Sequence, residues 1–495
     1  MKRMTRKGDS LLYTLRSGVE AKDRNGALYL VSRFPLKIMT LHRSWKPALD
    51  RLATGGSLSL QEIAAAVSHG DQSKVKRFLD DLVAKGYLSQ EGIEPVKDWP
   101  SVCVVIPVRN RPEEIAACLD SLNRVVYPEE KMEVIVVDDA STDETPEVVT
   151  RYPIRLISLK ERRQAPSCRN VGAAAAKGEI LAFLDSDCVA DPLWLKELVP
   201  AFEHPEVGVV GGVVDSAMEG NGLDRYEQVK SSLKIASWFK RSNRNERFFY
   251  VPSCNLLVRR EAFMQLGGFR ETLLVGEDVD FCWRAEDLGR LIDYRPKGRV
   301  LHKHRNRMKD FCFRRFEYGT SEPLLQQLHR RRTKRLIVLP SPSLFWALFF
   351  LAFAANSVIL FGLSWLWALA HGGVKFARIR KRRLPIGFAS LLGSVLRNYW
   401  AFLYHCCAFV SRYYLIGALL FLPFSPTLSF VITIAHVVAG ATEFFVKRPR
   451  LNLPAFFFYF TAEQIAYQTG VWWGCLKRLY FSPVNPTLAF RLPGQ

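Results

Sequence analysis

Residues 179–187 read EILAFLDSD, an apolar run of strand length that ends in two carboxylates one residue apart. A short apolar run without helical periodicity is typical of a buried strand. This spacing puts Asp185 and Asp187 together at the mouth of the strand. There they can share one hard cation, Mg²⁺ or Mn²⁺, that also contacts phosphate oxygens of a ligand.

The neighbouring segments repeat an alternation of apolar strand and helix. The predicted strands are SVCVVIPVRN (101–110), MEVIVVDDAS (132–141) and IRLISL (154–159), and the predicted helices cover 112–124, 142–150 and 168–177. Strands that are apolar throughout predict an α/β fold with a mostly parallel, Rossmann-like sheet and helices on both faces. Ligands of such sheets bind at the carboxyl ends of the strands. Neither GxGxxG nor GxxxxGK[ST] follows these strands, so dinucleotide redox and P-loop chemistry lose support.

A second acidic strand end strengthens the case for a binding site. A single Asp after a strand usually caps a helix or a turn, and Asp138, followed by Ser141 and Thr142, fits that role. Two acidic strand ends in one sheet favour a functional role instead. Asp139 is placed to accept a hydrogen bond from a base N–H group or a ribose hydroxyl, and Asp187 to hold a divalent cation against a diphosphate.

The segment VGEDVDFCWRAEDLGR (275–290) predicts a helix that begins with Glu277 and Asp278. Carboxylates at a helix N-terminus commonly pair with the helix dipole, which accounts for one of the two. Two adjacent carboxylates after Gly276 fit a general base better, because the neighbouring charge raises the pKa of the base. A tryptophan at a position such as Trp283 packs in a protein core more often than it stacks on a sugar ring, so a core role is favoured for it.

Two basic segments supply further candidates. His302 and His304 in RVLHKHR (299–305) lie on the same face if this segment is a strand. Either could provide the remaining ligand of the cation, and we favour His302. Arg169 opens the alanine-rich helix, and position alone does not separate a diphosphate or base contact from a surface ion pair.

Five motifs, in this order, resemble the family 2 glycosyltransferases of the GT-A fold: VVIPVRN, VIVVDDAS, CRNVG, LAFLDSD and GEDVDFCWR. The resemblance covers roughly residues 100–310. It implies that Pro107 and Asp139 contact the base of a nucleotide sugar and that Asp138 supports their turn. It also implies that Asp185 faces the ribose or the metal.

The same resemblance implies the chemistry of sugar transfer. Asp187 would coordinate the cation between the phosphates, and Asp278 would be the catalytic base of an inverting transfer, with Glu277 assisting. The cation would offset charge on the diphosphate leaving group. Attack opposite the leaving group would invert the anomeric centre, so an α-linked nucleotide sugar would give a β-glycoside. The Q-x-x-R-W motif of processive synthases is absent, so processive synthesis is not expected. GGVVDSA (211–217) and YVPSCNLLVRR (250–260) are candidates for the wall that selects the sugar, with Asn255 facing the acceptor.

Residues 1–96 predict a small α+β domain. Helical patterns at roughly 44–53, 60–67 and 72–85 precede a strand after Gly86, which is the element order of a winged helix. A DNA-binding module is one interpretation, but the mixed charge of 72–85 is weak for a recognition helix, so a docking or packing domain is favoured. The order also resembles the PqqD-like peptide-binding domain of ribosomal-peptide maturation systems.

The last third of the chain predicts membrane association. The chain has 69 Lys and Arg against 48 Asp and Glu, a formal charge of +21. Basic clusters at 329–335, 375–383 and 447–450 lie next to long apolar runs. This favours a membrane surface over nucleic acid. Residues 343–370 lack charge and are long enough to span a bilayer, but basic clusters on both sides fit a membrane-embedded hairpin or an interfacial helix better.

The whole chain resembles the glycosyltransferases of mycofactocin systems, with an N-terminal domain (1–96), a GT-A domain (97–325) and an apolar, membrane-associated helical region (326–495). That resemblance implies transfer of glucose from UDP-glucose to a small redox cofactor derived from a ribosomal peptide, at the cell membrane with the catalytic domain in the cytoplasm. An acceptor such as a polyprenyl phosphate or a cell-surface glycan is the alternative. A membrane-tethered winged-helix regulator is the remote alternative. The ten scattered cysteines, with no CxxC pair, fit reduced thiols.

Overall fold

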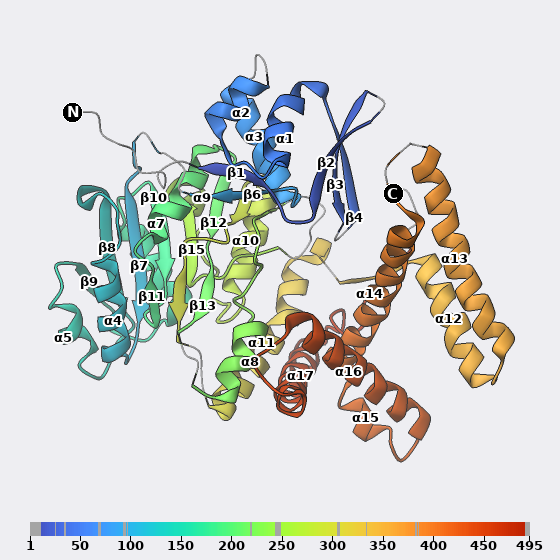
Figure 1. The fold of residues 1–495 in the computed structure, drawn as a ribbon. Coiled ribbons are helices and arrows are strands. Elements are labelled where there is room, and N and C mark those ends of the chain that lie inside the picture. The colour runs from blue at the N-terminus through green and yellow to red at the C-terminus, as the bar shows by residue number, and fades with distance from the viewer. Residues whose placement is uncertain are drawn as a thin grey trace. The chain divides into compact units, whose positions relative to one another are not determined.

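The computed structural model describes residues 11–24, 26–33, 36–67, 71–92, 96, 98–217, 220–242, 249–303, 307–332, 334–381, 384 and 386–490. The chain divides into two compact units, and Figure 1 shows their elements. The first unit includes Ile93–Arg332 and Lys447–Phe481, and the second includes Leu11–Gly92, Thr333–Val446 and Ser482–Gln495. The three-domain division expected from the sequence stays a prediction.

An eight-stranded sheet forms the centre of the first unit. In sheet order its strands are β14 (Lys240–Arg241), β16 (Leu291–Tyr294), β12 (Val207–Gly211), β15 (Asn255–Arg259), β10 (Ile180–Leu184), β7 (Val102–Val108), β8 (Met132–Asp138) and β9 (Arg155–Ser158). Strands β10, β7, β8 and β9 are mutually parallel, as are β12 and β16. Strand β15 pairs antiparallel with both β10 and β12, which joins the two parallel sets. The predicted mostly parallel sheet is therefore confirmed.

Helices cover both faces of this sheet, as the fully apolar strands predict. The helices are α4 (Pro112–Leu122), α5 (Thr145–Val149) and α7 (Trp194–Leu198) on one face, and α6 (Gln164–Ala175), α9 (Arg260–Gln265) and α10 (Glu277–Asp287) on the other. The alternation along β7 shows why. Val104 faces the first core, whereas Val105 faces the second, because successive side chains of a strand point to opposite faces.

A second, three-stranded sheet follows the carboxyl end of β10. It has the order β11 (Cys188–Ala190), β17 (Val300–His302) and β13 (Val214–Ser216). Strands β11 and β17 pair antiparallel with Cys188 opposite His302. The backbone N–H of Lys303 also donates to the carbonyl of Asp187 at 3.0 Å. This register brings a segment more than a hundred residues downstream to the end of the EILAFLDSD strand.

Two long helices close the first unit, α11 (Met308–Leu328) and α17 (Leu453–Arg478), together with the shorter α8 (Gly222–Lys230). Glycines let the backbones of α11 and α17 meet. A Cβ atom at Gly470 would lie 2.0 Å from the carbonyl oxygen of Phe316, and one at Gly319 would lie 2.2 Å from that of Tyr467. Close helix packing of this kind requires residues without side chains.

The second unit begins with the small α+β fold expected for residues 1–96. Its strands are β1 (Leu12–Leu15), β2 (Val19–Arg24), β3 (Ala27–Arg33), β4 (Leu36–Leu41), β5 (Leu58–Ser59) and β6 (Leu88–Glu91), and its helices are α1 (Lys46–Ala53), α2 (Leu60–Ala66) and α3 (Gln72–Ala84). Ser59 and Glu62 form a capping box at the start of α2. The three predicted helices and the following strand are confirmed, whereas the winged-helix and PqqD-like interpretations stay predictions.

The remainder of the second unit is mostly helical. It contains α12 (Pro340–Ala354), α13 (Val358–Lys381), α14 (Phe388–Tyr414), α15 (Gly417–Leu420), α16 (Pro426–Lys447), and the paired strands β18 (Arg335–Val338) and β19 (Thr487–Phe490). Helices α13 and α16 are long and apolar enough to cross a membrane. Phe345, Trp346 and Tyr399 hold α12 against α14, with the Trp346 indole N–H donating to the carbonyl of Tyr399 at 2.9 Å.

The glycine contact between α11 and α17 predicts a steric effect on stability. Gly470→Ala is expected to lower the free energy of unfolding by about 1–3 kcal/mol, because its Cβ meets a backbone carbonyl that cannot move aside. Gly373→Ala on α13, where a Cβ meets nothing within 4 Å, is the matched control and should be neutral or slightly stabilising. Thermal unfolding of both variants measures the difference. Equal Tm changes would contradict this packing.

Candidate active site

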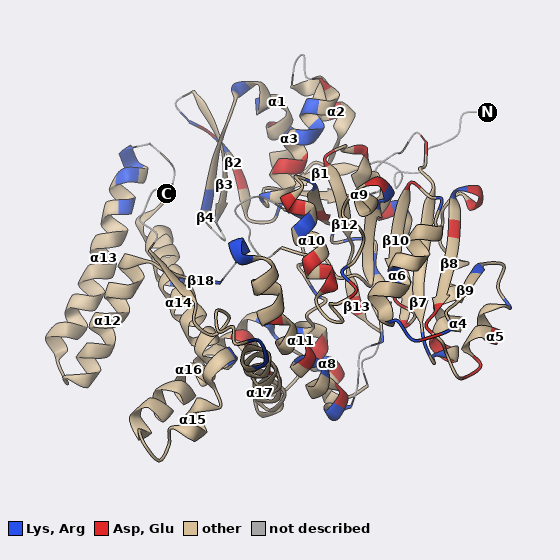
Figure 2. Cartoon of the chain, turned by 180° about the vertical axis from the view of Figure 1, so that it is seen from behind, with Lys and Arg blue, Asp and Glu red and all other residues tan. Residues whose placement is uncertain are grey.

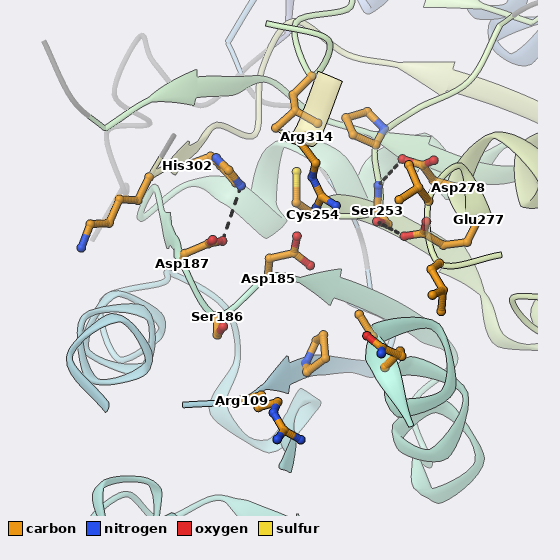
Figure 3. Close-up of a pocket in the computed structure, with 18 of the residues that line it drawn as sticks. Arg109, Asp185, Ser186, Asp187, Ser253, Cys254, Glu277, Asp278, His302 and Arg314 are labelled. Atoms are coloured by element: carbon orange, nitrogen blue, oxygen red, sulfur yellow. Dashed lines mark hydrogen bonds and ion pairs between the residues drawn. The ribbon is translucent and has the colours of Figure 1, made fainter. Parts of the chain in front are cut away.

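A cavity of about 620 Å³ opens at the carboxyl ends of β7, β8 and β10. Figure 3 shows Asp187 and His302 on one side, Glu277 and Asp278 on the other, and Asp185 and Arg314 between them. Pro107, Asp139 and Arg169 also line this cavity. The structure thus brings the predicted site residues together, with the exceptions of Asp138, which is not among the lining residues, and His304, which lies outside the described residues.

Arg169 connects the two sides of the cavity. Its Nη2 donates to Oδ1 of Asp185 at 2.6 Å and its Nη1 to Oε1 of Glu277 at 2.9 Å. Its side chain is only 3% exposed, so of the two alternatives left open by position the surface ion pair is wrong: the ion pairs of Arg169 are buried. Burial acts to raise the pKa of Asp185, but the guanidinium outweighs it and holds that pKa below its usual value. Nucleotide binding by Arg169 stays a prediction.

Asp187 and His302 form the part of the cavity that suits a divalent cation. Oδ1 of Asp187 is buried without a hydrogen-bond partner, and Nε2 of His302 lies 3.5 Å from it. With Sγ of Cys188, these ligand atoms lie within 4.8 Å of one another. Burial raises the pKa of the Cys188 thiol well above its usual value, which disfavours the thiolate. The remaining carboxylate and imidazole form a donor pair that suits a divalent cation.

Asp278 sits at the start of α10 in an environment that favours its protonated form. Gly276, with φ of 82°, turns the chain into the helix. Oδ1 of Asp278 accepts from the N–H of Val279 at 2.8 Å and Oδ2 from the N–H of Ser253 at 3.3 Å. Burial, and then the charge of Glu277, raise the pKa of Asp278 to about 7. This is the pKa range in which a general base works best at neutral pH.

The predicted nucleotide side is built by the ends of β7 and β8. Asp139 accepts from the backbone N–H groups of Arg163 and Gln164 at 2.5 and 3.0 Å, which fixes the start of α6. Asp138 accepts from the N–H of Ser141 at 3.2 Å, the turn-supporting contact that the resemblance implied. Pro107 lies in β7 opposite Val137 and faces the cavity.

One expectation about the acceptor wall is wrong. Asn255 has no exposed surface. Its Oδ1 accepts from the Trp194 indole at 2.8 Å, and its Nδ2 donates to the carbonyls of Val213 and Gly298 at 2.9 Å each. Every polar atom of this amide is therefore used to join core segments. Trp283 is buried with Leu273 and Leu325, the core role that was favoured for it.

Several cavity residues were not identified from the sequence. Arg111 donates from Nη1 to Oδ2 of Asp187 at 2.5 Å. Arg314 and Arg315 project from α11, and Arg315 pairs with Glu227 of α8 at 2.5 Å and Glu463 of α17 at 3.6 Å. For Arg111, the sequence offers one signal, its position directly after the VVIPVRN motif. Arg314 and Arg315 lie beyond the region that resembles family 2 glycosyltransferases, and their placement depends on helix packing that has no local sequence signature.

The chain is similar in sequence to known glycosyltransferases. The family model described as "Glycosyl transferase family 2" matches residues 103–267. The chain is 32% identical over 221 residues to glycosyltransferase AglE of Haloferax volcanii, covering 41% of this chain and 70% of that protein. It is 29% identical over 400 residues to the pre-mycofactocin glycosyltransferase of Mycobacterium tuberculosis, and the match covers 78% of this chain and 82% of that protein. The chain also matches a solved structure, that of mannosyltransferase PcManGT from Pyrobaculum calidifontis in complex with GDP-Man and Mn²⁺. The match has 20% sequence identity and a TM-score of 0.43, and it covers 76% of this chain and 88% of that chain.

The parallel strand ends with their acidic residues define a GT-A fold enzyme that transfers sugars. The chain belongs to glycosyltransferase family 2. The resemblance expected from the motifs is thereby confirmed, and with it the assignment as an enzyme. The alternative of a membrane-tethered regulator is left without support.

The raised pKa of Asp278 predicts a pH-dependent effect on stability. A carboxyl whose pKa is higher in the folded state costs stability once the pH exceeds its unfolded-state pKa of about 4, and the full cost is reached above the folded-state value of about 7. Asp278→Asn is therefore expected to raise Tm at pH 8 by roughly 3 °C or more and to change it little at pH 4.

Calorimetry or thermal unfolding across this pH range measures the effect. Asp120→Asn, at an exposed position on α4, is the control for removing one carboxylate outside the cavity, and its Tm is measured at the same two pH values. An Asp278→Asn effect that is equal at pH 4 and pH 8 would show that the carboxyl titrates normally.

Proposed function

We propose that the protein is an inverting, metal-dependent hexosyltransferase that uses a nucleotide sugar. The observation that carries this proposal is the position of Asp187 with His302 and of Asp278 on opposite sides of one cavity. A sugar held between them would have its leaving group on one side and its attacking hydroxyl on the other. Displacement from the face opposite the leaving group inverts the anomeric centre.

The donor side would bind the nucleotide and its diphosphate. Pro107 and Asp139 are proposed to contact the base, with Asp138 holding their turn. Asp187 and His302, with Asp185 beside them, would hold Mg²⁺ or Mn²⁺. When bound, the cation would offset the negative charge that develops on the diphosphate leaving group. Arg169 keeps Asp185 ionised and in place.

The acceptor side would remove a proton from the incoming hydroxyl. Asp278 is proposed as the general base, since its carboxylate lies in the cavity with a pKa near neutrality. Glu277 would assist by its charge, and its Oε1 is fixed by Arg169 and by Ser253 Oγ at 2.9 and 3.2 Å. These contacts hold the first turn of α10, and so aim Asp278.

For the substrates, we propose UDP-glucose as donor and a peptide-derived redox cofactor of the mycofactocin type as acceptor. The support is the printed name of the Mycobacterium tuberculosis relative, which is similar over 78% of this chain. A polyprenyl phosphate or cell-surface glycan acceptor is the alternative. Arg307, Arg314 and Tyr318 line the α11 side of the cavity, so an acceptor bound there would meet polar side chains.

We also propose that the second unit attaches the enzyme to the cytoplasmic face of the cell membrane, where nucleotide sugars are available. Helices α12 and α13 form a hairpin whose bend exposes Phe353, Val358 and Ile359 (67, 84 and 77% exposed). Figure 2 shows its Lys and Arg residues gathered at the end away from the bend. These include Arg378, Arg380 and Lys381 in the last turn of α13. A hairpin with an apolar bend and with basic residues at its opposite end suits insertion into an anionic bilayer.

A second apolar bend joins α15 and α16. Leu419, Leu420 and Phe424 there are well exposed to solvent. Figures 1 and 2 both show this bend on the same lower side as the bend of α12 and α13. Two such bends support a hairpin-type attachment, in which the basic ends stay at the headgroups.

The proposed chemistry predicts distinct losses from two substitutions. Asp278→Asn should lower kcat by about 10²–10⁴-fold with little change in donor affinity, because only the proton acceptor is lost. Asp187→Asn should instead abolish Mn²⁺-dependent binding of the donor. The measurement is release of UDP from UDP-glucose or UDP-GlcNAc, and of GDP from GDP-mannose, by the full chain in detergent with Mn²⁺ or Mg²⁺.

Asp120→Asn serves as the matched control and should keep wild-type turnover. If Asp278→Asn turned over at the wild-type rate, Asp278 would not be the base. A wild-type chain that released only GDP would exclude UDP-glucose as the donor.

The membrane proposal predicts that the bend of α12 and α13 is required for vesicle binding. The double substitution Val358→Glu and Ile359→Glu should reduce flotation with phosphatidylglycerol-containing vesicles severalfold, because two charges would have to enter the acyl region. Leu288→Glu, at an equally apolar exposed position outside the hairpins, should float like the wild type. Flotation of the double variant at the wild-type level would exclude insertion of this bend.

A further inference from the structure

Each carboxylate of the Asp185 and Asp187 pair already holds an arginine. Arg169 donates to Asp185 at 2.6 Å, and Arg111 donates to Asp187 at 2.5 Å. The two arginines differ in their freedom to move. Arg169 is buried and is fixed by a second carboxylate, Glu277, whereas the side chain of Arg111 is 38% exposed. Arg111 is therefore the member of this charge network that is able to change its partner.

The position of Arg111 opposes the binding of a cation on its own. Its guanidinium neutralises the charge of Asp187, while Arg169 neutralises that of Asp185. A divalent cation that approached Oδ1 of Asp187 and Nε2 of His302 would meet a positive charge on the other oxygen of the same carboxylate. Like charges a few ångströms apart repel strongly in a partly buried site. The charges that would attract the cation are thus already compensated.

A diphosphate in the same cavity reverses this balance. Arg111 and Pro107 both line the cavity, so a diphosphate placed beside the cation at Asp187 would be within the region that Arg111 faces. The planar fork of a guanidinium matches phosphate oxygens. Arg111 would then have a new anionic partner, and Asp187 would be released to the cation.

We propose that Arg111 couples cation binding to nucleotide binding. In the free protein its guanidinium occupies Asp187, and when cation and nucleotide bind together it turns to the diphosphate. Each ligand then removes the charge that opposes the other, so the two bind cooperatively. The inference rests on the proposed function, which supplies the cation at Asp187 and the diphosphate in the cavity.

The test compares two binding equilibria that Arg111 should affect in opposite directions. In the full chain, Arg111→Ala is expected to bind Mn²⁺ alone at least about fivefold more tightly, because the competing charge is gone. It is expected to bind UDP in saturating Mg²⁺ about tenfold more weakly, because a charge-assisted hydrogen bond is lost. Electron paramagnetic resonance of free Mn²⁺ and titration calorimetry with UDP and GDP give the two dissociation constants.

Matched variants make the outcome decisive. Arg111→Gln keeps most of the side-chain volume and should behave like Arg111→Ala if the latter folds poorly. Arg124→Gln removes a charge two residues beyond the far end of α4, at an exposed position, and should leave both dissociation constants unchanged. Unchanged or weaker Mn²⁺ binding by both Arg111 variants would overturn the proposal, and so would unchanged nucleotide affinity.

A further variant separates this inference from the proposed function. Asp187→Asn should abolish the binding of Mn²⁺. If it does while the Arg111 variants fail to bind Mn²⁺ more tightly, only the role of Arg111 is wrong. If Asp187→Asn binds Mn²⁺ like the wild type, the cation site itself is wrong, and the coupling falls with it.

Discussion

The buried guanidinium of Arg169 is the interaction on which both sides of the active site depend. It joins the end of β10 to the first turn of α10, segments whose contacting residues, Arg169 and Glu277, are 108 positions apart. Arg169 and Glu277 are largely removed from water here, whereas the Asp185 side chain is 28% exposed. Losing the guanidinium would leave two uncompensated carboxylates, at a cost below the roughly 3–5 kcal/mol of a fully buried pair. Because the three groups satisfy one another, the carboxylate at the donor side stays ionised. Asp278, which lies outside this network of hydrogen bonds, remains available to carry a proton.

The pairing of β11 with β17 is the second constraint. It fixes His302 opposite Cys188, one residue beyond Asp187. Backbone pairing of the two strands thus sets the spacing of the two residues proposed to hold the cation. The same small sheet joins β17 to β13, so the strand that carries the histidine is held on both edges. His302 therefore lies within a strand, and Asp187 lies in the short turn between β10 and β11.

The parts of the site that local sequence patterns predict are those with a local physical cause. Strand length and apolar character identified β7, β8 and β10, and the acidic residues at their ends followed directly. The start of α10 with Glu277 and Asp278 was also readable from periodicity. Contacts between residues that are distant in sequence could not be predicted in this way. Nothing near Asn255 in the sequence indicates that Trp194, Val213 and Gly298 occupy its amide, so the local pattern wrongly predicts that it faces the acceptor.

The same limit explains the missed arginine at Asp187 and the antiparallel strand β15. Arg111 and Asp187 are 76 positions apart, and only the parallel pairing of β7 with β10 brings them together. Strand β15 is apolar like its neighbours, and an apolar run does not reveal its direction. Strand direction depends on the path of the connecting chain, which the local pattern does not contain.

The contact of α17 with α11 has a consequence for the order of biosynthesis. Glu463 of α17 pairs with Arg315 of α11, and Tyr226 of α8 donates to Glu463, so one wall of the cavity depends on a helix near the end of the chain. The apolar helices α12 to α16 lie between these partners in sequence. A ribosome therefore completes the apolar segments before it delivers the helix that finishes the cavity wall. A chain still being translated holds the motifs for catalysis without their final support, so that the enzyme matures only after its apolar segments have emerged.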